Sequence, residues 1–139
     1  MSKFHFRLGR VLDLRREEEK SAKERFMEAR ARRIEAEFDL EGVNKTRELA
    51  LNHEVSCLES MRALDSYLAK LEDEVQHINS AIGVLVDEEN AAKDLWIQAK
   101  QDADALQKLH DAEFEEWKKE EARREQNELD EWATTRRAA

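Results

Sequence analysis

The fold is decided by the stretch Ser56–Leu85, SCLESMRALDSYLAKLEDEVQHINSAIGVL. Its apolar residues recur at alternating steps of four and three and form one continuous seam: Cys57, Met61, Leu64, Leu68, Leu71, Val75, Ile78, Ile82 and Leu85. A 3.5-residue repeat sustained over about four heptads is typical of a coiled-coil helix. Ser56 and Glu59 stand ahead of the run in the order of a capping box, which predicts that a helix begins there.

A helix that begins in the middle of the chain implies that another helix ends before it. The seam continues backwards at the same spacing through a thinner set of apolar residues: Val43, Leu40, Ala36, Ala29, Phe26, Ala22, Leu12 and Leu8. We therefore predict a first helix over about 6–51, a turn over about 52–56 and a longer second helix over about 56–132. Gly42–Asn44 is the rival position for the turn.

The expected fold class is all-α, a long antiparallel two-helix coiled-coil hairpin that forms a single domain over residues 1–139. The composition agrees, because 41% of the 139 residues are charged, proline is absent and there are only three glycines. Such a chain is typical of long helices and cannot enclose a large core. The single cysteine, Cys57, excludes an internal disulfide.

Localisation follows from two missing signals. No apolar run reaches the ~18 residues that a membrane-spanning helix requires. The N-terminal sequence MSKFHFRLGR lacks the continuous apolar region of a secretory signal. We therefore expect a cytoplasmic protein.

The charge is distributed unevenly. The net charge of −9 argues against nucleic acid as a partner. Residues 1–35 nevertheless carry eleven Lys/Arg against seven Asp/Glu. With a turn near residue 54, residues 3–35 face 73–105, which hold eight acids and two lysines. Antiparallel pairing sets these opposite charges side by side, so the sequence favours an intramolecular hairpin over a parallel dimer.

The same register leaves the second helix without a partner after about residue 105. The large apolar residues of this overhang include Phe114, Trp117, Leu129 and Trp132. Large apolar side chains on an unpaired helix are candidates for binding another protein. The alternative is that they fold back or tolerate exposure.

Residue patterns for catalysis or metal binding are absent from the sequence. It has no Gly-rich phosphate loop, no His-Glu-x-x-His and no Cys-x-x-Cys, and its histidines are scattered at His5, His53, His77 and His110. The carboxylates are expected on solvated helix faces, where their pKa values are not tuned for catalysis. We expect no enzyme activity, no catalytic residues, no metal, no cofactor and no small-molecule substrate.

Three stretches together resemble the flagellar export protein family FliJ. The start, FHFRLGRVLDLRREEE (Phe4–Glu19), is similar to the family's opening of alternating Phe and basic residues followed by a leucine-rich run and glutamates. YLAKLEDEVQHI (Tyr67–Ile78) is similar to its motif just past the turn. The end, EFEEWKKEEARREQNELDEWATTRR (Glu113–Arg137), looks like its C-terminal signature. The three lie in the family's order and spacing across nearly the whole chain.

The resemblance implies a non-enzymatic, cytoplasmic stalk, peripheral at the inner-membrane export apparatus. Such proteins bind the hexameric flagellar export ATPase with the end that carries both termini, and they also bind the export gate's cytoplasmic domain and export chaperones. The implied ATPase-binding residues are Phe4, Phe6, Leu8, Val11, Leu12, Arg15, Trp117, Arg123, Arg124, Leu129 and Trp132.

The gate-contacting face that the resemblance implies consists of Tyr67, Leu71, Glu74 and Ile78. Tyr67 and Leu71 fit the aromatic residue and the leucine of the family pattern. Glu74 and Ile78 depart from the small residue and the histidine found in some members. Leu71 and Ile78 also belong to the seam, so a structural role is open for both.

Three other interpretations remain open at this point. The chain could be the stalk of a virulence-type secretion system, which has a looser pattern of the same kind. It could be a structural coiled-coil scaffold, which would self-associate through the seam. The N-terminus, with Phe4, Phe6, Leu8, Val11 and Leu12 beside arginines, could lie at a membrane surface.

Overall fold

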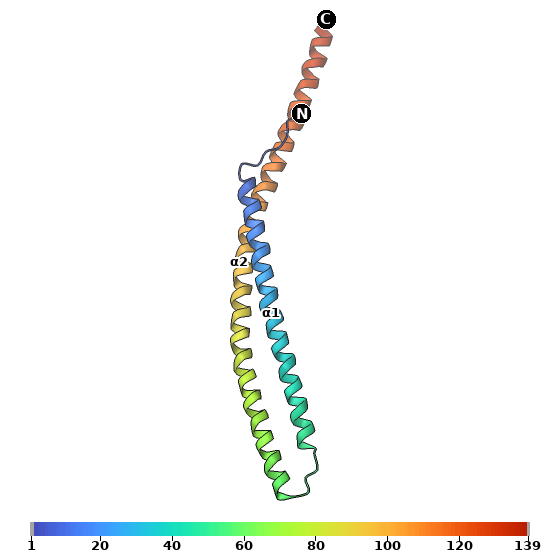
Figure 1. The fold of residues 1–139 in the computed structure, drawn as a ribbon. Coiled ribbons are helices and arrows are strands. Elements are labelled where there is room, and N and C mark those ends of the chain that lie inside the picture. The colour runs from blue at the N-terminus through green and yellow to red at the C-terminus, as the bar shows by residue number, and fades with distance from the viewer. Residues whose placement is uncertain (1, 139) are drawn as a thin grey trace. The chain divides into compact units, whose positions relative to one another are not determined.

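The fold consists of two helices joined by a short loop. A computed structural model describes residues 2–138, with α1 over Gly9–Leu51 and α2 over Leu58–Ala138 (Figure 1). Helix α1 has 43 residues and α2 has 81, and the described residues contain no strand. The predicted all-α class with a longer second helix is confirmed. Within residues 2–138 neither helix offers an apolar stretch long enough to cross a membrane.

The observed helix bounds differ slightly from those expected. Helix α1 begins at Gly9 rather than about residue 6, and α2 begins at Leu58 and continues to Ala138 rather than about residue 132. The rival turn at Gly42–Asn44 lies inside α1, in regular helix. A glycine in a helix interior is less favourable than alanine by about 1 kcal/mol, which a helix of this length tolerates.

The two helices contribute to two compact units. One unit comprises Ser21–Trp96 and includes the loop, and the other comprises Met1–Lys20 with Ile97–Ala139. In the unit Ser21–Trp96, the buried side chains are contributed by both helices: Phe26, Ala29, Leu71 and Val75. The other predicted seam residues from Leu64 to Leu85 are half-buried, so the 3–4 spacing identified the packed face correctly.

The pairing register of this unit differs from the one expected. Phe26 stacks on Trp96 with ring centroids 5.5 Å apart, and Arg47 Nη1 lies 2.9 Å from Glu72 Oε2. Arg33 forms an ion pair with Glu89. A tight turn near residue 54 would have set Arg47 opposite residue 61 and Arg33 opposite residue 75. The observed partners lie eleven and fourteen positions further along α2.

The loop is the physical reason for this shift. Residues 53–57 are not helical, and they run beside the first turns of α2 instead of reversing tightly (Figure 1). Five extended residues reach at most about 17 Å. That distance equals the rise of about eleven helical residues. The first turns of α2 therefore project past the end of α1, and the seam residues Cys57 and Met61 are exposed rather than packed.

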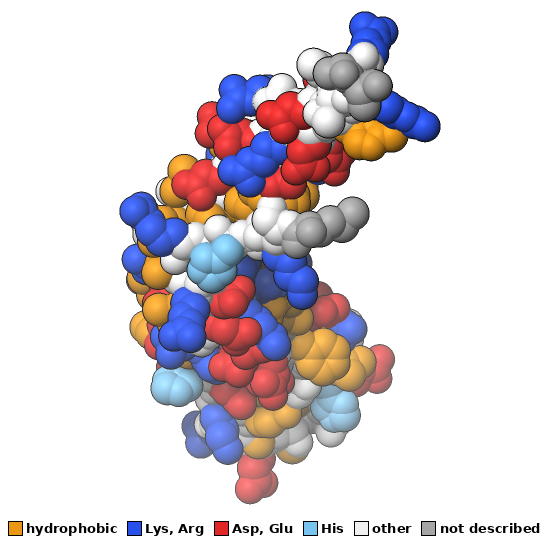
Figure 2. Space-filling model, turned by 90° about the horizontal axis from the view of Figure 1, so that it is seen from above, with side chains coloured by type: hydrophobic (Ala, Val, Ile, Leu, Met, Phe, Trp, Pro, Cys, Tyr) orange, Lys and Arg blue, Asp and Glu red, His pale blue; other side chains and the backbone are white. Residues whose placement is uncertain are grey.

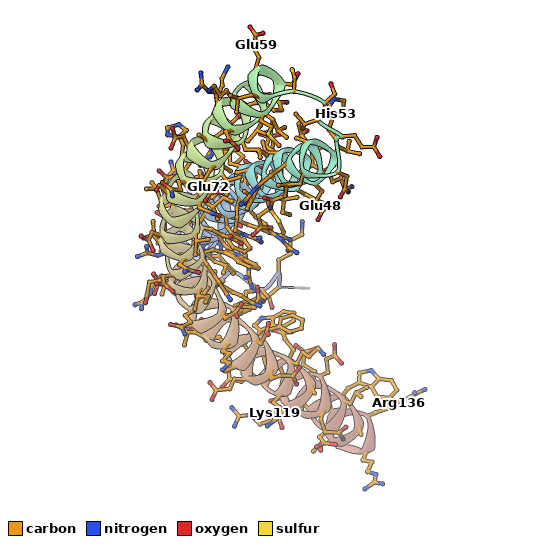
Figure 3. All side chains as sticks on the ribbon, turned by 90° about the horizontal axis from the view of Figure 1, so that it is seen from below. Glu48, His53, Glu59, Glu72, Lys119 and Arg136 are labelled. Carbon is orange, nitrogen blue, oxygen red and sulfur yellow. The ribbon has the colours of Figure 1, made fainter. Side chains whose placement is uncertain are left out.

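Cys57, rather than Ser56, caps α2. The Cys57 sulfur accepts a hydrogen bond from the Ser60 backbone N–H at 3.5 Å, and its carbonyl accepts one from Met61 N–H at 3.0 Å. Glu59 points away from α1 (Figure 3), so the predicted Ser56–Glu59 capping box does not form. The N–H groups of the first turn of a helix have no carbonyl partner within the helix. Cys57 satisfies one of them by accepting a hydrogen bond from the backbone N–H of Ser60, the third helical residue.

The observed register predicts which engineered cysteines form a disulfide. Phe26–Trp96 and Arg33–Glu89 bracket Ala29 and set it opposite residues 92–93, of which Ala92 is the half-buried one. In a Cys57→Ser background, Ala29→Cys with Ala92→Cys is expected to oxidise within one chain, because the register brings these two covered positions together. Non-reducing electrophoresis and mass spectrometry measure this.

The control pair is Ala29→Cys with Asn79→Cys, which a tight turn would bring together. It is expected to stay reduced under the same conditions. Oxidation of the control pair in preference to the first, or crosslinks only between chains, contradicts the register.

The cap also predicts the reactivity of Cys57. The hydrogen bond with the Ser60 side chain, 3.0 Å away, and the Ser60 backbone N–H both lower the pKa of the exposed thiol. A lowered pKa means that the thiolate forms at lower pH than in the unfolded chain, and the thiolate is the nucleophile. Alkylation of the native protein by iodoacetamide is expected to rise with pH earlier than in urea. Ser60→Ala is expected to shift that rise to higher pH, and an unchanged profile contradicts the assignment.

Candidate functional site

The N-terminal segment packs against α2 in the unit formed by Met1–Lys20 and Ile97–Ala139. The Phe4 ring lies 5.4 Å from His110, 5.2 Å from Phe114 and 5.8 Å from Trp117, between ring centroids. Phe6 lies edge-on to His110 at 5.2 Å and is 8% exposed. Extended backbone sends alternate side chains to one side, so Phe4 and Phe6 both face α2. We call these five residues the aromatic cluster.

The cluster depends on a change of spacing in α2. The covered residues Ala103, Leu106, His110, Phe114, Trp117 and Glu121 follow steps of three, four, four, three and four. Two successive steps of four residues place an eleven-residue repeat among the seven-residue repeats, an irregularity called a stutter. Beyond the stutter, the packed face of α2 is shifted by one residue. Phe114 and Glu121 therefore occupy the positions that an unbroken heptad would give to Glu113 and Glu120.

This packing corrects the expected start of the overhang. We expected α2 to be uncovered after about residue 105, but Phe4 and Phe6 cover His110, Phe114 and Trp117. The shifted register brings the N-terminal segment that far along α2. From residue 122 to residue 137 every side chain is exposed, and we call this stretch the terminal tail.

Arg16 makes the polar contact across the helices beside the cluster. Its guanidinium donates to Glu19 at 2.8 Å, to Asp104 at 3.1 Å and to Gln107 at 3.5 Å. The bonds to Glu19 and then Asp104 raise the pKa of Arg16 above its usual value. Arg15, which the sequence indicated, pairs instead with Glu18 on its own helix at 3.1 Å.

The remaining N-terminal residues of the expected ATPase-binding set differ in accessibility. Leu8 and Leu12 are half-buried, as expected for seam residues. Val11 is 39% exposed and stands on the outer side of α1. In this set the structure therefore brings together Phe4, Phe6 and Trp117, and it leaves Val11 on the surface.

The terminal tail presents large apolar and basic side chains to solvent. Leu129 and Trp132 are each 60% exposed. The Arg136 guanidinium lies 4.9 Å above the Trp132 ring, within the range of a cation–π contact (Figure 3 labels Arg136). Arg124 pairs with Glu121 at 3.5 Å, and Arg123 is exposed. Basic and acidic side chains are interspersed over the surface seen in Figure 2, so the tail does not form a patch of one sign.

A second site lies between α1 and α2 in the unit Ser21–Trp96. Tyr67, Leu71, Glu74 and Ile78, all expected at the export gate, line one open groove of about 650 Å³. Lys70 completes the α2 wall, and the α1 wall is formed by Phe38, Asp39, Gly42, Val43 and Thr46. Leu71 is 5% exposed and belongs to the packed seam, whereas Tyr67 is 45% exposed. We call this feature the groove.

Phe38 is the groove residue that sequence reasoning missed. It is 73% exposed, compared with 60% for Trp132 and 45% for Tyr67, the other exposed aromatic side chains among the described residues. It lies off the 3–4 seam, so periodicity carries no signal for it. An apolar residue at a position that the seam does not explain is the signal that could have identified it.

The structure presents two candidate binding surfaces, the terminal tail and the groove. Among residues 2–138, no three His, Cys, Asp or Glu side chains come close enough to hold a metal ion. The two surfaces are of different kinds: the tail is an exposed helix with aromatic and basic residues, and the groove is a shallow channel with apolar and acidic residues.

Comparison with known families assigns the chain. The family model described as "Flagellar FliJ protein" matches residues 4–138, which include the aromatic cluster, the groove and the tail. The chain belongs to the FliJ family. It is therefore a component of the flagellar export apparatus. No curated protein and no solved structure is detectably similar to it.

The family match includes both the N-terminal segment and the terminal tail. The match runs from Phe4 without a break, so the N-terminal segment that covers Trp117 belongs to the family domain and is not an appended arm. It also includes the terminal tail, whose side chains from residue 122 to residue 137 are exposed.

The aromatic cluster predicts a specific fluorescence change. In a Trp96→Phe and Trp132→Phe background, only Trp117 emits. Phe4→Ala with Phe6→Ala is expected to red-shift Trp117 emission, because the ring that contacts it at 5.8 Å is lost and water replaces it. Far-UV circular dichroism is expected to stay nearly constant, because residues 2–8 are not helical.

Phe38→Ala in the same background is the matched control, since Phe38 is an exposed phenylalanine outside the cluster. It is expected to leave the emission unchanged. An unshifted spectrum in the Phe4 and Phe6 variant shows that the segment does not cover Trp117.

Proposed function

We propose that the chain is a non-enzymatic stalk of the flagellar export apparatus that binds the hexameric export ATPase through the unit carrying both termini. The single observation that carries this proposal is the terminal tail. Leu129 and Trp132 stay exposed although burying them would be favourable, Arg136 lies over the Trp132 ring, and Arg123 and Arg124 are exposed on the same stretch of helix. Aromatic anchors with arginine neighbours are enriched among the residues that dominate binding energies.

The aromatic cluster supports this use of the tail. Phe4 and Phe6 are held on α2, so in this proposal they brace the helix from which the tail projects. Val11, and the outer faces of Leu8, Leu12 and Arg15, remain available for direct contact with the ATPase. Trp117 serves as the boundary between the braced part of α2 and the tail.

We further infer that the groove binds the cytoplasmic domain of the export gate. Tyr67, Leu71, Glu74 and Ile78 line one surface, and Tyr67 and Glu74 are accessible there. Export chaperones are the third proposed partner. The corresponding location is the cytoplasmic side of the inner membrane, peripheral to the export apparatus. Neither nucleic acid nor a small-molecule substrate has a part in this function.

The alternatives are less well supported. The family model is that of the flagellar protein, which favours the flagellar over the virulence-type system. A scaffold would self-associate through the seam, but Phe26, Leu71 and Val75 of the seam are already buried within one chain. Phe4 and Phe6 face α2, so they are not free to enter a membrane surface.

The tail predicts the outcome of a truncation. Removing residues 123–139 leaves the aromatic cluster, the groove and all contacts across the helices in place. The shortened chain is expected to keep its melting temperature and to lose most stimulation of the purified export ATPase. Steady-state ATP hydrolysis and hexamer formation by light scattering measure this loss.

Leu129→Ala with Trp132→Ala in the full-length chain separates the anchors from the length of the helix. This variant is expected to lose stimulation nearly as fully as the truncation, while Thr134→Ala, an exposed tail position, retains it. Full stimulation by the truncated chain would show that the tail is not the ATPase-binding element.

A further inference from the structure

The groove differs from the rest of the helix pair in its ion pairing. Elsewhere, α1 arginines meet α2 carboxylates, as in Arg33–Glu89 and Arg47–Glu72. Asp39, Lys70 and Glu74 line the groove, and none of them forms an ion pair with another described residue. Charged groups left without a partner beside an apolar channel are available to a ligand that supplies the opposite charge.

The charge around the groove is predominantly negative. Two of its three charged lining residues are carboxylates, Asp39 and Glu74. The nearby exposed residues on both helices add more carboxylates than cations: Glu35, Glu41 and Asp65, against Lys45. Lys45 is paired with Glu41 at 3.3 Å. The chemical complement of this surface is a basic segment.

Gly42 adds a steric feature to the same channel. It lines the groove, it is exposed, and a Cβ at this position would meet no atom of the chain within 4 Å. Packing within the chain therefore does not require glycine here. The Thr46 hydroxyl donates to the Gly42 carbonyl at 3.0 Å. The missing side chain leaves space beside Gly42 itself, where another backbone can approach closely.

Phe38 and Tyr67 form the two aromatic walls of this opening, one from each helix. They are 73% and 45% exposed. Exposed aromatic side chains that flank a channel present a large area for burial at small cost in conformational entropy. The apolar floor between them includes Val43, Leu71 and Ile78.

We propose that the groove holds a basic segment of the export gate's cytoplasmic domain, whose backbone lies against Gly42 and whose Lys or Arg side chains meet Asp39 and Glu74. This inference rests on the proposed gate-binding role and deepens it. It assigns half of the binding surface to α1, through Phe38 and Gly42. It also makes Glu74 a specificity residue, which selects a cationic partner.

The test measures the affinity of full-length variants for the purified gate domain from the same bacterium by isothermal titration calorimetry. Gly42→Ala is expected to weaken binding by about tenfold, because an added methyl group in a close contact is destabilising. The same substitution is expected to raise the melting temperature, since alanine is the better helix former.

Gly83→Ala is the matched control. Gly83 is also a helical glycine with no atom within 4 Å of an added Cβ, and it does not line the groove. It is expected to raise the melting temperature similarly and to leave the dissociation constant unchanged.

The charge of the partner is tested by a second matched pair. Glu74→Lys is expected to weaken binding by about tenfold at low ionic strength and by less at high ionic strength, where charges are screened. Asp73→Lys changes the net charge equally but lies outside the groove lining. Its effect is expected to stay within about twofold.

The outcomes separate this inference from the gate-binding role on which it rests. If Tyr67→Ala weakens binding while Gly42→Ala and Glu74→Lys do not, the gate-binding role stands and the basic segment at Gly42 is refuted. If the unaltered chain does not bind the gate domain at all, both are refuted. Tighter binding by Glu74→Lys overturns the assignment of a basic partner.

Discussion

The register of α1 on α2 is the constraint on which the rest of the structure depends. It is fixed where Phe26 stacks on Trp96 and where Arg33 pairs with Glu89. In a two-helix pair, each residue faces one place on the partner helix, so a shift of the register changes all facing pairs at once. The extended loop after Leu51 permits the observed register, because it spans the first turns of α2 instead of reversing at once. In the other unit, the stutter after Leu106 turns Phe114 rather than Glu113 towards Phe4.

The stability of such a pair comes mainly from its apolar contacts. Exposed ion pairs such as Arg15–Glu18 contribute about 0–1 kcal/mol each, because water screens them and two long side chains must be ordered. Few of the described residues are buried, and among them Ala103 has no exposed surface. Two helices can cover one seam and no more, so most side chains stay in solvent. Large exposed surface is therefore intrinsic to this fold, and it is available for partners.

The sequence predicted the parts of the structure that depend on local periodicity. The packed face from Leu64 to Leu85 follows from the spacing of apolar residues, and so does the helical class. The register was wrong, because it depends on the loop's conformation, and a five-residue segment can be tight or extended with the same composition. The cap was assigned to Ser56 because hydroxyl side chains are the common caps, whereas the Cys57 sulfur accepts the bond. Arg15 and Arg16 are adjacent, and only the frame of α1 against α2 decides that Arg16 reaches Asp104.

Features that the seam does not require are the most informative about function in a chain of this kind. Nearly every residue of a helical pair is either packed in the seam or solvated on the surface, and neither state distinguishes one coiled coil from another.

A glycine inside a helix carries a cost of about 1 kcal/mol that the pair would avoid with alanine. Gly42 and Gly83 carry the same local cost and have the same free space around them, so a helical glycine alone assigns nothing. Only Gly42 lies in a groove with exposed Phe38 and Tyr67 and with carboxylates that form no ion pair with another described residue. The needs of folding do not explain why these features occur together at one place, whereas the binding of a partner does. No single one of the features leads to this conclusion.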